Sequence, residues 1–223
     1  MGKKSLLLSS LALLAVSWAV APPRAEAISC VNVSNVMLLP GAGCDFGGLT
    51  FSNFNVSASA GFTAATVGTG AASIATPSNV NLIYQLSSTP GVGPGDVLLS
   101  YGVTASPGIR LTGIDLTNDA TTGVVIGEIA CRVMFSPTGT CAPADRLATL
   151  VATTGQTMNA FFASPVDFVF LHKDIDILEG GFISDFSNSH DISTVPEPAT
   201  LLLLGSTLTG MGLAWRRRGG RLA

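Results

Sequence analysis

Three acidic residues near the end of the chain have types and spacing that could bind a metal ion: Asp174, Asp176 and Glu179. Residues i and i+2 of a strand point to the same side, so Asp174 and Asp176 could hold one Ca²⁺ together with backbone oxygens. The segment lacks the Asp-x-Asp-x-Asp-Gly order of an EF-hand loop, and an exposed strand end is also expected to be charged. The sequence leaves two interpretations, a calcium site and a solvated acidic edge, and indicates no other cofactor.

Serine-based catalysis has little support. Ser189, His190 and Asp191 are direct neighbours, whereas a catalytic triad is assembled from separate parts of a chain. The sequence has no Gly-x-Ser-x-Gly motif. Its two tryptophans, Trp18 and Trp215, lie in the terminal segments, which counts against a glycosidase and against a strong carbohydrate-binding face. We predict that the protein is not an enzyme; a secreted hydrolase is the weakest alternative.

The four cysteines predict disulfides. Cys30 and Cys44 flank one turn rich in Pro and Gly, and Cys131 and Cys141 flank another. An even number in an exported protein suggests two bridges, and of the three possible pairings we favour the local one, Cys30–Cys44 with Cys131–Cys141. A zinc site is disfavoured because there is no Cys-x-x-Cys motif and the histidines are distant in sequence.

The elements that must position these residues are strands. No amphipathic helical pattern persists between residues 28 and 187, where short alternating segments are separated by Gly, Pro, Ser, Thr and Asn. This pattern predicts an all-β fold, an antiparallel β-sandwich or jelly roll. Residues 143–151 could be a short helix or another strand. The predicted strands are 49–57, 62–67, 80–86, 97–104, 109–117, 124–135 and 166–177.

A change of parity predicts a β-bulge. Ile109 and Leu111 share one parity, while Ile114 and Leu116 share the other. All four can face the core only if one extra residue intervenes, so we expect the bulge near residues 112–113.

The last predicted strand has two different faces. One face is apolar, with Val169, Leu171, Ile175 and Ile177. The other face becomes polar towards its end, with Phe168, Phe170, His172, Asp174 and Asp176. The polar residues 188–195 that follow are predicted to be a linker.

The charge of the central region excludes one class of partner. Between residues 28 and 195 there are four bases and twelve acids, a net charge of −8. A nucleic-acid-binding domain needs Lys and Arg to displace phosphate counterions, so we expect no nucleic acid as partner.

The N-terminal segment is typical of a secretory signal peptide, residues 1–27. Lys3 and Lys4 precede an apolar run over residues 6–20, and Ala25-Glu26-Ala27 places small residues at the −3 and −1 positions of a cleavage site. Cleavage after Ala27 is expected, with an uncleaved N-terminal anchor as the alternative.

The C-terminal segment predicts a membrane helix. Residues 199–215 carry no charge, and 17 residues at about 1.5 Å each reach the short limit for crossing a bilayer core. Arg216, Arg217 and Arg218 follow and would stay on the cytoplasmic side. The prolines at 196 and 198 keep the preceding segment extended and accessible to a protease.

This tail resembles the PEP-CTERM sorting signal. Pro196, Glu197 and Pro198, the apolar helix and the arginines all match it, over residues 196–221. The resemblance implies recognition by an exosortase, a membrane protease-transpeptidase, with cleavage near the motif and Glu197 as the recognition residue. The region before the tail is similar to secreted β domains of unassigned function that often precede such signals.

The resemblance implies a route and suggests a role. The protein would cross the inner membrane, remain anchored there until cleavage, and reach the cell surface or the extracellular matrix. We expect a structural or adhesive role in exopolysaccharide or biofilm, with polysaccharide as a partner. A calcium-dependent carbohydrate-binding module is the main alternative.

Overall fold

The computed structural model of the chain is built almost entirely from β-strands. The parts that it describes are residues 28–31, 43–58, 66–70, 73–87, 94–120, 122–135, 139–195 and 205–208.

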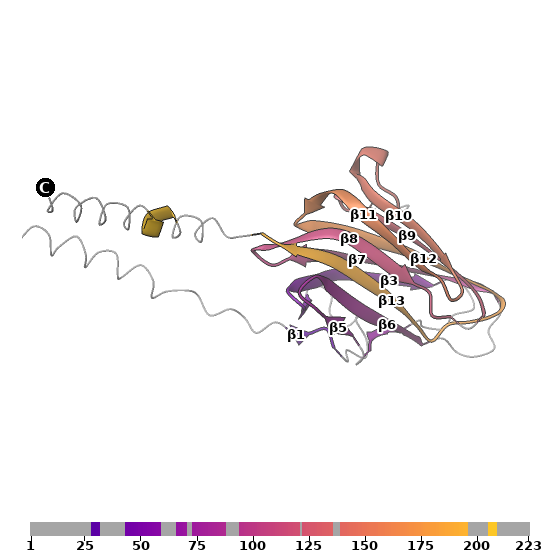
Figure 1. Cartoon of the computed structure of the whole chain (residues 1–223). Helices are drawn as coiled ribbons and strands as arrows, with labels where there is room; N and C mark the ends of the chain where they lie inside the picture. Colours follow the sequence, from indigo (N-terminus) through magenta and orange to yellow (C-terminus); the bar gives the residue numbers. More distant parts are fainter. Residues whose placement is uncertain are drawn as a thin grey trace, which may run out of the picture.

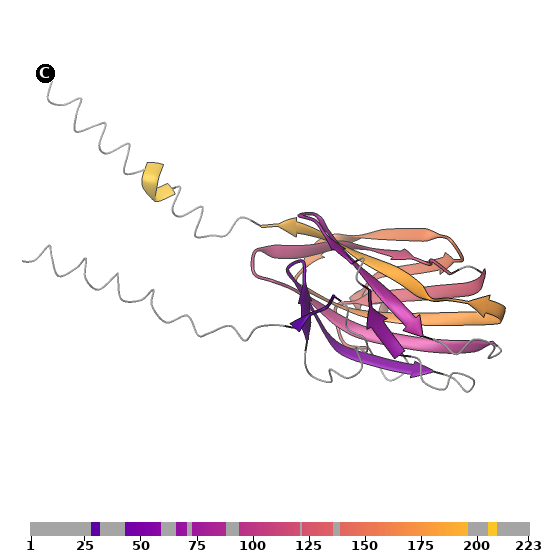
Figure 2. The same cartoon turned by 90° about the horizontal axis from the view of Figure 1, so that it is seen from below.

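The described strands form two sheets that pack face to face as a sandwich (Figures 1 and 2). Neighbouring strands are antiparallel, apart from the short parallel pair β1–β2. This confirms the predicted all-β class. The first sheet has the order β1 (Ile28–Ser29), β2 (Cys44–Phe46), β3 (Leu49–Ala58), β7 (Gly95–Ala105), β12 (Phe168–Phe182), β9 (Thr122–Cys131) and β10 (Arg146–Thr153). The second has the order β11 (Thr157–Val166), β8 (Ile109–Thr117), β13 (Asp185–Thr194), β6 (Asn79–Ser87) and β4 (Thr66–Thr69), with β5 (Ile74–Ala75) also paired to β6.

The core lies between the two sheets, and strand alternation decides which side chains reach it. On β12 the expected apolar set is buried: Val169, Leu171, Ile175 and Ile177. Lys173 has the same parity and is also fully buried. Tyr84 and Phe186 stack with ring centroids 5.1 Å apart, and each ring of such a pair buries a large apolar area.

The predicted β-bulge in β8 is confirmed. Asp191 of β13 pairs with Gly113, whereas the next residue, Ile192, pairs with Leu111, so one residue of β8 is left between the two pairs. Leu111 and Ile114 are both completely buried. The extra residue therefore allows apolar residues of opposite parity to face the same core.

The predicted linker at residues 188–195 is wrong. Residues 188–194 belong to strand β13, which pairs with β6 on one side and β8 on the other. Asn188 and His190 are fully buried on its inner face. The polar composition that indicated a linker belongs to a central strand, in which Asn188 finds its hydrogen-bond partners inside the sandwich.

Other boundaries differ from the expectations by a few residues. Strand β9 ends at Cys131, because the next residues leave the sheet as a disulfide-bonded loop. The undecided stretch 143–151 is one turn of 3₁₀-helix, Pro143–Asp145, followed by β10. Strand β11 was not predicted. The predicted strand 62–67 lies mostly outside the described residues.

Both disulfides have the predicted local pairing, Cys30–Cys44 and Cys131–Cys141. The first ties the residue after β1 to β2, and the second closes the loop between β9 and the 3₁₀ turn. No cysteine in the described residues is free.

The terminal segments lie mostly outside the described residues. These include the predicted signal peptide 1–27 with Ala25 and Ala27, and the predicted sorting residues Pro196, Glu197, Pro198, Arg216, Arg217 and Arg218, so these predictions lie outside the described residues. Within the expected membrane helix, residues 205–208 are described, and they are helical. In the described part of the chain, no helix has the length and hydropathy needed to span a membrane. The first strand and the end of β13 lie at the same end of the sandwich (Figures 1 and 2).

Candidate functional site

An open hollow of about 590 Å³ lies on the outer face of the seven-stranded sheet. Its size is within the usual range of small-molecule sites, about 300–1,000 Å³. Three strands and one loop line it. The lining residues are Asn53, Asn55 and Ser57 from β3; Leu98, Ser100 and Tyr101 from β7; Phe170 and His172 from β12; and Met134, Phe135 and Gly139 from the loop after β9.

The floor of the hollow is set by the register of the strands. Ser100 pairs with His172 on one side and with Asn55 on the other, so these three residues form one row across the sheet. Gly102 pairs with Phe170 in the next row. The floor thus combines amide, hydroxyl and imidazole groups, which can donate and accept hydrogen bonds, with a phenyl ring.

The wall of the hollow is the loop closed by the Cys131–Cys141 disulfide. The ring of Phe135 lies 5.3 Å from that of His172 and 6.4 Å from that of Phe170, measured between centroids. Gly139 has a φ of +72°, and a Cβ there would lie 2.6 Å from Nε2 of His172. A glycine is therefore required for the loop to approach the sheet this closely.

An acidic cluster lies beside the hollow on the same face. Asp96 of β7 pairs with Asp176 of β12, and Asp174 is two residues away on β12. One carboxylate oxygen from each of these three residues lies within 4.8 Å of the others. Glu179, predicted from the sequence to join Asp174 and Asp176, is not a member of this group, and the binding of a metal ion stays a prediction. Sequence reasoning missed Asp96, because it lies on a strand remote in sequence and only the β7–β12 register brings it to the cluster.

The electrostatics of this face reflect its concentration of acids. Burial, followed by the hydrogen bond and negative charge of Asp174, raises the pKa of Asp96 to about 6. Burial lowers the pKa of His172, and the charge of Asp174 partly opposes this effect. A cation near the cluster would relieve the repulsion, whereas an anion would be repelled.

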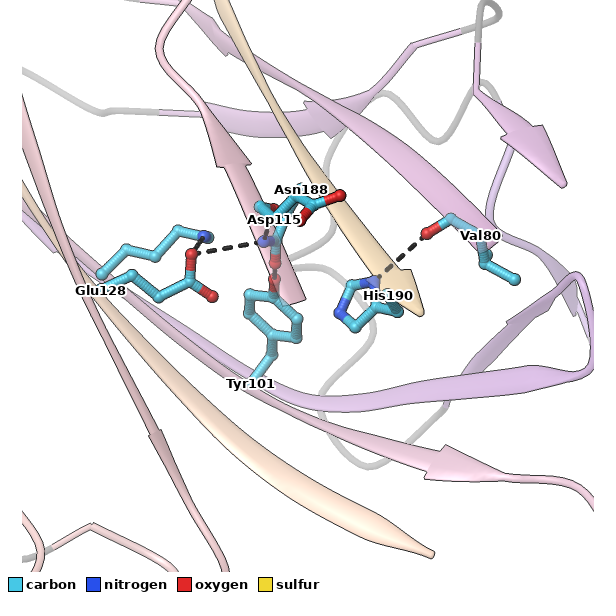
Figure 3. A network of polar contacts seen from close by, with 7 residues as sticks. Val80, Tyr101, Asp115, Glu128, Asn188 and His190 are labelled. Atoms are coloured by element: carbon cyan, nitrogen blue, oxygen red, sulfur yellow. Dashed lines mark hydrogen bonds and ion pairs between the residues drawn. The ribbon is translucent and has the colours of Figure 1, made fainter. Parts of the chain in front are cut away.

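The interior of the sandwich holds a second polar group of residues (Figure 3). Lys173 Nζ and Glu128 Oε2 form an ion pair of 2.6 Å in which neither side chain is exposed. Asn188 Nδ2 donates to the same oxygen at 3.2 Å, and the Tyr101 hydroxyl donates to Asn188 Oδ1 at 2.6 Å. Burial lowers the pKa of His190 to about 3, so this side chain is neutral near pH 7.

The structure separates the members of the Ser189-His190-Asp191 sequence. His190 points into the core, where Nδ1 lies 3.4 Å from the carbonyl oxygen of Val80. Asp191 is half-buried and accepts a hydrogen bond from Asn79 at 3.0 Å. Because adjacent residues of a strand point to opposite faces, these three cannot act as a triad.

The C-terminal segment matches a known sorting signal. The family model of the PEP-CTERM protein-sorting motif matches residues 194–218, so the chain carries this motif. The match begins at the last residue of β13. A comparison of the sequence with curated proteins finds no match.

Among solved structures, TmCBM61 in complex with β-1,4-galactotriose is 14% identical over 66% of this chain and 90% of its own, with a TM-score of 0.31. A carbohydrate-binding module of the β-sandwich superfamily is 12% identical over 77% of this chain and 64% of its own, with a TM-score of 0.33. The family 11 carbohydrate-binding module of Clostridium thermocellum, solved with a β-1,3-1,4-mixed-linked tetrasaccharide, is 11% identical over 66% of this chain and 96% of its own, with a TM-score of 0.30.

Proposed function

We propose that this PEP-CTERM protein is exported, held at the inner membrane until an exosortase cleaves near Pro196-Glu197-Pro198, and released to the cell surface or extracellular matrix. The sorting motif at 194–218 supports this route. There the β-sandwich has a non-catalytic, adhesive role and holds a segment of extracellular polysaccharide in the hollow on its outer face.

The observation that carries the binding role is the composition of the hollow. Asn53, Asn55, Ser57 and Ser100 supply neutral donors and acceptors, which a polyhydroxylated chain requires. Phe170 supplies an apolar surface against which the C–H face of a sugar can pack. The hollow is open, so it can accept part of a polymer rather than enclose a small molecule.

The negative charge of the domain limits which class of polysaccharide it can bind. The region 28–195 has a net charge of −8, and the acidic cluster adjoins the hollow. None of the cationic side chains in the described residues lines it. We therefore expect neutral polysaccharides to bind better than polysaccharides rich in uronic acids.

Binding can be tested by affinity electrophoresis of the full chain, solubilised in a non-ionic detergent, through gels containing neutral or uronic-acid polysaccharides. Asn55 is exposed, and replacing it by alanine should weaken binding to a retarding polysaccharide about tenfold, the loss of one or two hydrogen bonds. Asn159→Ala is the matched control, since this exposed asparagine lies on β11 of the other sheet. Equal retardation of both variants, or no retardation by any gel, contradicts the binding role.

A calcium-dependent form of the same binding is the second candidate, favoured by the third carboxylate that Asp96 adds to the cluster. Calorimetric titration with Ca²⁺ tests it. Heat of binding that is lost in Asp174→Asn supports this form, and the absence of both heat and a rise in melting temperature rejects it.

The route can be tested separately by the mass of the processed protein. Co-expression with an exosortase should yield a product that lacks Arg216 to Arg218, and Glu197→Ala should retain them. A product that keeps these arginines in the presence of an active exosortase contradicts the proposed processing.

A further inference from the structure

Three reactive side chains meet in the buried interior between the sheets. Lys173 of β12 and Glu128 of β9 are direct partners in the ladder, and Asn188 faces them from β13 of the opposite sheet. Glu128 is 1% exposed, and Lys173 and Asn188 are not exposed at all. Figure 3 shows the carboxylate of Glu128 and the side chain of Asn188 pointing toward each other.

One oxygen atom joins the amine to the amide. Glu128 Oε2 lies 2.6 Å from Nζ of Lys173 and 3.2 Å from Nδ2 of Asn188. Nδ2 also donates to the backbone oxygen of Asp115 at 2.5 Å, which fixes the plane of the amide. A carboxylate that contacts both nitrogens can take a proton from one and give it to the other.

The carbonyl of the same amide is polarised. The Tyr101 hydroxyl donates to Asn188 Oδ1 at 2.6 Å. A donor at this position stabilises the negative charge that develops on the oxygen when a nucleophile adds to Cγ. Tyr101 is 1% exposed, so this hydrogen bond is shielded from bulk solvent.

The surroundings also favour the reactive protonation states. Burial lowers the pKa of Lys173 and raises the pKa of Glu128, while their mutual attraction acts in the opposite direction on each. Both shifts favour transfer of a proton from the ammonium to the carboxylate, which leaves a neutral amine. Glu128 Oε1 has no hydrogen-bond partner in the described part of the chain and is available to carry that proton.

We propose that Lys173 and Asn188 react with each other and form an intramolecular isopeptide bond. Nζ of Lys173 adds to Cγ of Asn188, with Tyr101 stabilising the resulting oxyanion. Glu128 accepts a proton from Nζ and delivers one to Nδ2, the bond between Cγ and Nδ2 breaks, and ammonia leaves. The net reaction joins one amine and one amide with loss of NH₃, and it needs no oxidant, metal or added reactant.

The bond would cross-link the centre of the sandwich. Lys173 lies on β12, which has neighbours on both sides in the first sheet, and Asn188 lies on β13, which has neighbours on both sides in the second. The two disulfides each act within a peripheral segment, so among the described residues this bond would be the side-chain cross-link that joins the two sheets. It also removes the free-energy cost of burying an ion pair, because the product is a neutral amide.

Mass spectrometry of the full chain, expressed without an exosortase, reduced, denatured and digested with trypsin, tests the proposal directly. The basic residues around the site are Arg146, Lys173 and Arg216, so an unreacted chain gives peptides 147–173 and 174–216. An acylated lysine is not cleaved. We therefore expect one peptide covering 147–216, lighter by about 17 Da, the mass of one ammonia.

Two variants separate the chemistry from the fold. Glu128→Gln keeps the size of the side chain but cannot transfer the proton, and Asn188→Ala removes the electrophile. Both should give the two separate peptides at full mass. If a variant fails to fold, the peptide masses of the wild type are sufficient to decide. Cleavage after Lys173 in the wild type overturns the proposal, and so does a loss of 17 Da with that cleavage retained, which would indicate a succinimide at Asn188.

Discussion

Replacing His190 by leucine should make the folded domain more resistant to acid. His190 is fully buried, its ring packs edge-on against Phe51 at 5.3 Å between centroids, and its Nε2 has no hydrogen-bond partner among the described residues. Burial is the main cause that lowers its pKa from 6.5 to about 3. Protonation in the folded state is therefore strongly disfavoured.

The lowered pKa of His190 determines the direction and the size of the change in unfolding free energy with pH. Between pH 6.5 and pH 3 the unfolded state binds a proton at His190 that the folded state does not, so the free energy of unfolding falls as the pH falls. At 1.36 kcal/mol per pH unit, the loss is about 2 kcal/mol between pH 6.5 and pH 5. Asp96, whose pKa is raised, contributes in the opposite direction, but it does so equally in both proteins.

Urea unfolding followed by far-UV circular dichroism, at pH 7 and pH 5, measures the difference. The wild type should lose about 2 kcal/mol more than His190→Leu between these two values. His172→Leu is the comparison: burial also lowers the pKa of His172, but this side chain is only half-buried, so its replacement should change the pH dependence less than His190→Leu does. Identical pH dependence in the wild type and His190→Leu would show that the interior does not exclude the proton, and the reasoning would fail.

Two further changes have defined outcomes. Asp96→Asn should raise the free energy of unfolding at pH 7 by about 1–2 kcal/mol, because it removes a carboxylate whose pKa is raised to about 6. The gain should vanish by pH 4, where the carboxyl group is protonated in the folded protein. Urea unfolding at both pH values checks this. Replacing Cys131 and Cys141 by serine should lower the free energy of unfolding by about 3 kcal/mol, as expected for a loop of this length. The same change should abolish retardation in polysaccharide gels, because it releases the wall of the hollow, whereas serines at Cys30 and Cys44 should leave retardation intact.

The fold class could be predicted because apolar alternation is a local signal. The parity change between Leu111 and Ile114 predicted a bulge that the β8–β13 register confirms. The pairing of the cysteines followed from their short separations. These features depend on neighbours in sequence, and strand geometry turns them into structure without information about distant parts of the chain.

The sites were harder to predict because they depend on register between distant strands. Asp96 joins Asp174 and Asp176 only through the β7–β12 pairing. The hollow depends on a loop that folds back over its own sheet. Asn188 and His190 were assigned to a linker because polar residues usually face water. Partners on other strands satisfy the buried amide of Asn188, whereas the buried imidazole of His190 is kept neutral by its lowered pKa. The burial of Lys173 could have been predicted from the sequence, since its parity on the strand matches that of Leu171 and Ile175.

Strand β13 connects the two proposals. It is the strand that leads into the sorting motif, so any force on the C-terminal end of the protein enters the sandwich through it. Its ladders with β6 and β8 hold it along its length, but ladder hydrogen bonds can open one after another when a strand is pulled from its end. An isopeptide bond at Asn188 would stop that opening six residues from Thr194 and transfer the load to β12. The outer face of β12 carries Phe170 and His172 of the hollow, so one strand would connect the C-terminal end of the β-sandwich to the surface proposed to hold the matrix.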